Sequence, residues 1–134
     1  MKAKKQLRIL FLFGIILSCI SCDNDDKVDI SQLIGKWSVY NDDPNLAVDG
    51  SVEYTFKDDN TCSIYSYDAL SNRDTTIMRT YIISNDKKII TIFNKESAYA
   101  EQYYILKLTS KEMKWENASP NDGNFDKTLR KRQE

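Results

Sequence analysis

The class of fold is indicated most clearly by residues 52–68, VEYTFKDDNTCSIYSYD. The first five of these residues alternate strictly between apolar and polar, as they do along a strand with one buried face. Polar residues 57–60 (KDDN) indicate a hairpin loop. Residues 61–68 alternate again and place Cys62 and Ile64 on the same face. The stretch therefore predicts two antiparallel strands joined by a tight turn.

The rest of the chain repeats this pattern. Further runs rich in aromatic and β-branched residues lie at 37–40, 75–84, 88–94, 99–109, 113–116 and 125–132. Clusters of turn-forming residues separate them, and no helical run long enough for a parallel crossover intervenes. Eight short strands predict an all-β antiparallel meander. Such a meander removes its exposed edges by closing into a small up-and-down barrel. An open β-sandwich is the alternative.

The N-terminus carries the pattern of a signal peptide. Four basic residues precede an unbroken apolar run of nine, residues 9–17 (ILFLFGIIL). Such a run is too short to span a bilayer, which takes about 20 residues, and its basic start is typical of a secretory signal. We therefore expect a signal peptide at 1–21, a lipidated cysteine with an acidic tether at 22–29, and one domain at 30–134.

The end of the apolar run carries a cysteine motif. Residues 19–22 (CISC) resemble a bacterial lipobox, in which a small residue precedes the lipidated cysteine. The resemblance implies that Cys22 joins the chain to the membrane through covalent lipid, with Cys19 as the alternative site. Acidic residues 23–26 (DNDD) resemble the stretch that sends some lipoproteins to the outer face of the outer membrane. We expect a surface-exposed outer-membrane lipoprotein; a periplasm-facing one is the alternative.

Charge and composition exclude several functions. Four of the 19 basic residues lie in the first 21 positions, and all 20 acidic residues follow them. The mature chain therefore carries 15 basic and 20 acidic residues. An acidic chain does not suit nucleic acid, where phosphate attraction supplies most of the affinity. The sequence has no histidine, the commonest general base and metal ligand. Carboxylate pairs at 42–43 and 58–59 lack the spacing of a calcium loop. We expect no enzyme, cofactor or metal.

The first predicted strand opens with Gly35-Lys36-Trp37, after a helical turn at 30–34 that Asp29 is placed to cap. This opening resembles the G-x-W motif of the lipocalins, and the whole domain resembles the short lipocalin-like domains of bacterial lipoproteins. The resemblance implies that Trp37 closes one end of an eight-stranded barrel and that Arg130 packs across its ring. The T-D-Y motif of larger lipocalins and their C-terminal helix are absent from this sequence.

A set of apolar side chains falls on faces expected to point inward: Tyr54, Phe56, Ile64, Leu106 and Trp115. Either they line a pocket or they are simply core. The first interpretation predicts a non-catalytic binding protein for a small hydrophobic molecule, as the lipocalin resemblance implies. The second predicts a structural or interaction module with a filled barrel. In that module exposed tyrosines such as Tyr65, Tyr67 and Tyr103 would contact a cell-surface protein or glycan.

Overall fold

The computed structural model describes residues 27–40, 51–119 and 124–133. The predicted signal peptide, Cys22 and most of the acidic tether lie outside these ranges. The described elements, in chain order, are the 3₁₀ helix η2 (Ile30–Gln32) and the strands β1 (Gly35–Tyr40), β2 (Val52–Phe56), β3 (Thr61–Asp68), β4 (Arg73–Ile83), β5 (Ile89–Phe93), β6 (Ala100–Leu108), β7 (Glu112–Asn117) and β8 (Lys127–Lys131).

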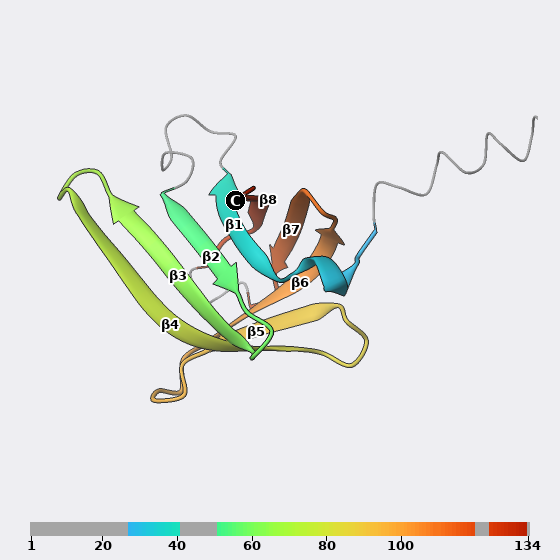
Figure 1. Cartoon of the computed structure of the whole chain (residues 1–134). Coiled ribbons are helices and arrows are strands. Elements are labelled where there is room, and N and C mark those ends of the chain that lie inside the picture. The colour runs from blue at the N-terminus through green and yellow to red at the C-terminus, as the bar shows by residue number, and fades with distance from the viewer. Residues whose placement is uncertain (1–26, 41–50, 120–123, 134) are drawn as a thin grey trace, which may run out of the picture.

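The eight strands form one closed barrel, shown in Figure 1. Each strand pairs antiparallel with the next, and β1 pairs antiparallel with β8 to close the ring. The predicted up-and-down barrel is confirmed, and the open sandwich is wrong. The predicted bounds of β2 and β3 match the structure, and the other strands differ by one or two residues at an end, the usual uncertainty where strands fray.

The short helix at one end of the barrel is stabilised by a cap on its first turn. Asp29 is the predicted N-cap and accepts hydrogen bonds from the Ser31 amide (3.2 Å) and the Ser31 hydroxyl (2.6 Å). These bonds, the hydroxyl bond first, lower the pKa of the Asp29 carboxyl below its usual value. The helix ends at Gln32, and the chain enters β1 three residues later, at Gly35.

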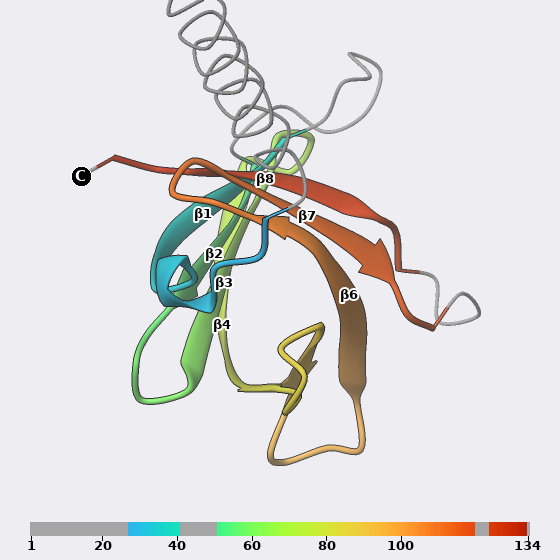
Figure 2. The same cartoon turned by 90° about the vertical axis from the view of Figure 1, so that its right-hand side faces the viewer.

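The last part of the predicted tether belongs to the barrel. The Asp29 amide donates to the Leu108 carbonyl (3.0 Å), and the Leu108 amide donates to the Lys27 carbonyl (2.9 Å). Val28 thus forms a parallel bridge with Leu108, at the end of β6, and Figure 2 shows the blue segment there beside η2. Backbone contacts with the barrel therefore reach as far as Lys27, within the predicted tether.

The barrel has two distinct ends. The end that we call the helix end holds η2 and the turns at 57–60, 84–88 and 109–111. The opposite end, which we call the far end, holds the turns at 69–72 and 94–99 and the start of β8. Between the two ends the inward-facing side chains form a single hydrophobic cluster that includes residues of all eight strands.

Candidate functional site

The helix end is closed by Trp37. Its side chain is fully buried, and its Nε1–H donates to the carbonyl of Leu33 at 2.8 Å. The chain reaches this position through Gly35, whose φ of +131° is a conformation that L side chains rarely adopt. A Cβ at Gly35 would lie 2.9 Å from Cε of Lys131. The G-x-W motif therefore turns the chain from η2 into β1 and ties the helix to the barrel.

The cation above this tryptophan is Lys131, and the expectation that Arg130 packs across Trp37 is wrong. Nζ of Lys131 lies 5.2 Å from the centroid of the Trp37 ring, within cation–π range, and donates to the Gln32 carbonyl at 2.8 Å. Arg130 instead lies over the Tyr40 ring at 3.6 Å. The reason is the pairing of β1 with β8: Lys131 is opposite Trp37, so its neighbour along the strand faces the other way.

Three of the predicted ligand-binding residues pack against one another inside the barrel. The Trp115 ring meets the Tyr54 ring edge to face at 5.3 Å and the Phe56 ring at 6.0 Å, and all three side chains are buried. Ile64 is half-buried beside them, opposite Tyr54 and Ile77 on the neighbouring strands. These rings form part of the packed core of the barrel.

Leu106, the remaining predicted ligand-binding residue, faces outward. Its side chain is 48% exposed, whereas Ile105 and Leu108 are buried. The pairing of β6 with β7 shifts between Ile105 and Lys107, which is a β-bulge. Because a bulge inserts one residue into a strand, the inward face changes from odd to even positions there. Strict alternation read backward from Leu108 therefore gives the wrong face for Leu106.

Tyr103 shares the inward face with Ile105 and is fully buried, so the expectation of an exposed tyrosine at this position is wrong. Its ring stacks on Trp115 with centroids 5.0 Å apart. Its hydroxyl donates to Oε2 of Glu101 at 2.7 Å and accepts from Nζ of Lys127 at 2.9 Å. Tyr99 donates to Oε1 of the same Glu101 at 2.9 Å. A hydrogen-bonded network thus lies over the aromatic core on the side of the far end.

We call Tyr54, Glu101, Tyr103, Trp115 and Lys127 the far-end cluster. Burial raises the pKa of the Tyr54 phenol, and the Glu101 charge adds to the shift. Burial, followed by the hydrogen bond to Glu101, raises the pKa of Tyr103. Both phenols therefore stay protonated at neutral pH. The cluster combines flat apolar rings with fixed hydrogen-bonding groups, an arrangement suited to holding a molecule.

One polar atom of this cluster has no partner. Among the residues that the structure describes, Nε1 of Trp115 is buried and finds no hydrogen-bond acceptor. The side chain is only 1% exposed. A buried donor left in this way costs about 1–3 kcal/mol of stability, and native proteins hold few of them. No sequence pattern indicates this unsatisfied donor, because its satisfaction depends on which acceptors surround the indole in space.

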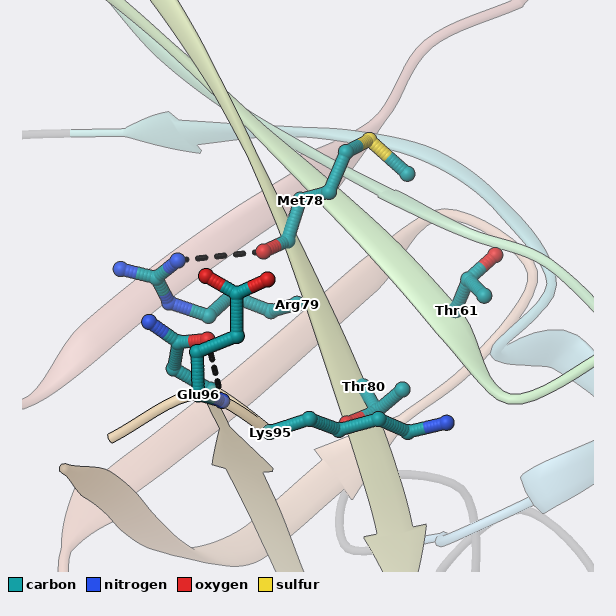
Figure 3. A pocket seen from close by; sticks show the side chains of 7 residues that line it. Thr61, Met78, Arg79, Thr80, Lys95 and Glu96 are labelled. Carbon is teal, nitrogen blue, oxygen red and sulfur yellow. Dashed lines mark hydrogen bonds between the residues drawn. The ribbon is translucent and has the colours of Figure 1, made fainter. Parts of the chain in front are cut away.

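Two of the shallow pockets are lined by described residues. One, of about 210 Å³, lies where the β5–β6 turn meets β4 and is lined by Thr61, Met78, Arg79, Thr80, Asn94, Lys95 and Glu96 (Figure 3). The other, of about 240 Å³, lies along β7 and β8 and includes Tyr40, Leu106 and Thr128 together with Trp115 and Lys127 of the far-end cluster. Both are smaller than the roughly 300 Å³ at which small-molecule pockets begin.

The described ranges contain neither a metal site nor a membrane-spanning helix. No group of three Cys, Asp or Glu side chains there is arranged to hold a metal ion. In those same ranges, no helix is long and apolar enough to cross a bilayer. Cys62 is buried and unpaired with another cysteine. Burial, and secondly the charge of Glu101, raise the pKa of its thiol to about 12.

These observations define a class: a small closed antiparallel barrel with a plugged helix end and a polar aromatic cluster toward the far end. The solved NMR structure of a protein from Bacteroides uniformis ATCC 8492 is 53% identical to this chain over 84% of its length and 99% of that protein's, with a TM-score of 0.65. The chain belongs to the same family as that protein. No family model and no curated protein matches the sequence.

Proposed function

We propose that this protein is a non-catalytic, lipocalin-like binding protein, held at the outer membrane by lipid on Cys22, that takes a small, largely apolar molecule at the far-end cluster. The observation that carries the proposal is the buried Nε1–H of Trp115, which lacks an acceptor among the described residues. A bound molecule that offers an acceptor to this donor would recover the cost of burying it.

The surroundings of that donor indicate the chemistry of the molecule. Trp115 stacks on Tyr103 and meets the edge of Tyr54, so its neighbours are flat and apolar. The phenol of Tyr103, with Glu101 and Lys127 bonded to it, adds polar groups at the rim. A flat apolar body with one hydrogen-bond acceptor fits both features, since few well-placed polar groups orient a ligand in a mainly apolar site.

The attachment of the chain supports the same interpretation. Lys27 is bonded to Leu108 at the helix end, and only residues 23–26 separate it from Cys22. Five extended residue steps span at most about 17 Å. Lipid on Cys22 would therefore hold the helix end toward the membrane and turn the far end toward the surrounding medium. The lipobox-like CISC and the acidic DNDD are the grounds for placing that lipid at the outer face of the outer membrane.

A second candidate is the interaction module with a filled barrel, which would bind a cell-surface protein or glycan. The close packing of Tyr54, Phe56 and Trp115 favours it, because their rings lie within 5.3–6.1 Å of one another. Tyr67 and Tyr104 are among the exposed large side chains that such a partner would contact.

Native mass spectrometry separates the two candidates. The full-length chain is purified from its own envelope in mild detergent, and its mass is measured before and after organic extraction. The carrier predicts a stoichiometric added mass that extraction removes. A Trp115→Phe variant, which lacks the donor, should hold that mass about tenfold more weakly, the equivalent of about 1.4 kcal/mol.

Ile82→Ala is the matched control, since this side chain is 56% exposed on β4 and lines neither of the two pockets described above. It should retain the added mass at the level of the wild type. A bare protein mass under every growth condition would overturn the carrier in favour of the filled barrel. Equal retention by Trp115→Phe and Ile82→Ala would remove the bound molecule from the far-end cluster.

A further inference from the structure

Arg79 belongs to the inner face of β4. The register of β3 with β4 sets Arg79 opposite Cys62, and Cys62 is itself opposite Phe56 on β2. Cys62, Phe56 and Tyr81, which lies two residues further along β4, are all buried. Because side chains alternate along a strand and directly opposite residues share a face, Arg79 lies on the same face as these three. In Figure 3 its side chain leaves β4 on the other side from Met78. It therefore brings a permanent positive charge beside the aromatic core.

The Arg79 guanidinium uses little of its hydrogen-bonding capacity within the protein. Its Nη1 donates to the carbonyl of Met78, the preceding residue, at 3.1 Å (Figure 3). Among the described residues it forms no ion pair, since the pairs found there join other side chains. A guanidinium carries five N–H donors in a planar fork that matches the two oxygens of a carboxylate. Within the described ranges, most of these donors are therefore open to a bound molecule.

Arg79 lines the pocket that opens where β4 parts from β5. The two strands pair only from Thr80 onward, and the β5–β6 turn supplies Asn94, Lys95 and Glu96 to the pocket wall. The volume of about 210 Å³ is room for a head group rather than for a whole ligand. The charged lining residues are two cations, Arg79 and Lys95, and one carboxylate, Glu96, so the lining carries one net positive charge. A head group with a single negative charge complements this lining.

We propose that the molecule held at the far-end cluster is a carboxylic acid whose carboxylate pairs with Arg79 in this pocket. The proposal rests on the function proposed above and extends it, because the molecule would carry an anionic head in addition to the acceptor for Trp115. Phe56 is opposite Cys62, which is in turn opposite Arg79. The Phe56 ring meets the Trp115 ring at 6.0 Å and the Tyr81 ring at 5.1 Å. Apolar surface therefore links the surroundings of Arg79 with the buried indole, and the body of the acid would cover it.

The charges near Arg79 favour a carboxylate as its partner. Glu101, the carboxylate of the far-end cluster, accepts from Tyr99 and Tyr103, and the same Tyr103 hydroxyl accepts from Lys127. The charge of Glu101 is thus compensated within that cluster rather than by Arg79. A phosphate monoester carries a charge of about −1.5 to −2, which exceeds the single positive charge of the pocket lining. A carboxylate carries one charge and meets a guanidinium through two parallel hydrogen bonds.

Chemical modification of the bound molecule tests its class. The full-length chain is purified from its own envelope in mild detergent, and the molecule that organic extraction releases is methylated. Methylation raises the mass of a carboxylic acid and leaves that of an amide or ester unchanged, and tandem mass spectrometry locates the added methyl group. We expect a methyl ester of a carboxyl group. A mass that methylation leaves unchanged, or a methyl group on a phosphate, would overturn this proposal and leave the carrier function standing. A bare protein mass would overturn both.

Substitutions test the residue, with retention measured as the fraction of chains that carry the added mass over a dilution series. Arg79→Gln should hold the molecule about tenfold more weakly than wild type. Arg73→Gln, the matched control, removes the same charge at the exposed start of β4 and should bind like wild type. Glu96→Gln removes the negative charge of the pocket lining and should bind more tightly.

Circular dichroism of each variant should match that of the wild type. If Arg79→Gln alters the spectrum, Glu96→Gln carries the test by itself, because its side chain is exposed on a turn. Equal retention by folded Arg79→Gln and Arg73→Gln would overturn the assignment of the carboxylate to Arg79. Weaker retention by Glu96→Gln than by wild type would overturn it as well, since an anionic head group gains from the loss of a neighbouring negative charge.

Discussion

The two tryptophans offer a matched test of how the helix end is held. Both side chains are buried, but Trp37 donates to the Leu33 carbonyl at 2.8 Å, whereas Trp115 has no acceptor among the described residues. Substituting phenylalanine removes the same atoms in each case. The two variants therefore differ mainly in the hydrogen bond, and the comparison isolates its contribution.

The expected magnitudes follow from these contacts. Each substitution removes buried ring atoms, at a cost of about 1–2 kcal/mol. Trp37→Phe also leaves the Leu33 carbonyl without its donor, at about 1–3 kcal/mol, and weakens the contact with Lys131 by about 0.5–1 kcal/mol. Trp115→Phe removes an unsatisfied donor, which offsets the lost packing. We expect Trp37→Phe to lose about 2.5–6 kcal/mol and Trp115→Phe to remain within about 1 kcal/mol of wild type.

Urea unfolding of the full-length chain, followed by far-ultraviolet circular dichroism, measures both values. A difference of 2 kcal/mol or more also corresponds to a separation of melting temperatures of about 8 °C or more for a domain of this size. Equal losses in the two variants would contradict this expectation, because the bond from Trp37 to the Leu33 carbonyl would then contribute no stability. A larger loss for Trp115→Phe would mean that this indole has a partner in solution.

Three further outcomes are expected. Gly35→Ala should lose about 1–3 kcal/mol in the same unfolding assay, because its φ of +131° strains any side chain, and adding Lys131→Ala should not restore the loss. Lys131→Met should shift the fluorescence of Trp37 and lower the melting temperature, while Arg130→Met, which lies over a different ring, should leave that fluorescence unchanged. Cys62 should resist iodoacetamide at pH 8.5 until urea is added, since its pKa is raised to about 12 from 9.0. Because the pKa of this thiol is higher in the folded than in the unfolded chain, its contribution to stability is present below about pH 9 and is lost between pH 9 and 12. Urea unfolding midpoints measured across this alkaline range would test the loss.

The strands of this barrel could be predicted from sequence because their signals are local. Alternation in VEYTF and the KDDN turn place β2 and β3 within the correct bounds, and the G-x-W motif indicates the closed end. The N-cap at Asp29 could also be predicted, since its partner is only two residues away. Each of these features depends on neighbours along the chain, which a single sequence displays directly.

The errors fall where the pairing of distant strands decides the outcome. Leu106 faces outward and Tyr103 faces inward, the reverse of the prediction, because of a bulge between Ile105 and Lys107. No residue type in this stretch indicates the bulge. Lys131 replaces Arg130 above Trp37 because the β1–β8 register sets it there, and the two cations look alike in sequence. A shift of one residue moves a side chain to the opposite face of a strand, so small uncertainties in register become complete errors of placement.

The residue pattern alone was enough to predict the number and order of the strands and the position of most turns, and the lipocalin resemblance implied the residue that closes the helix end. Closure of the barrel was needed to show which aromatic rings meet, which buried donor lacks an acceptor among the described residues and where β4 extends beyond β5. The difference lies in the range of the interactions. Strand formation depends on a period of two along the chain, whereas register, burial and the satisfaction of hydrogen bonds depend on residues that closure of the barrel brings together.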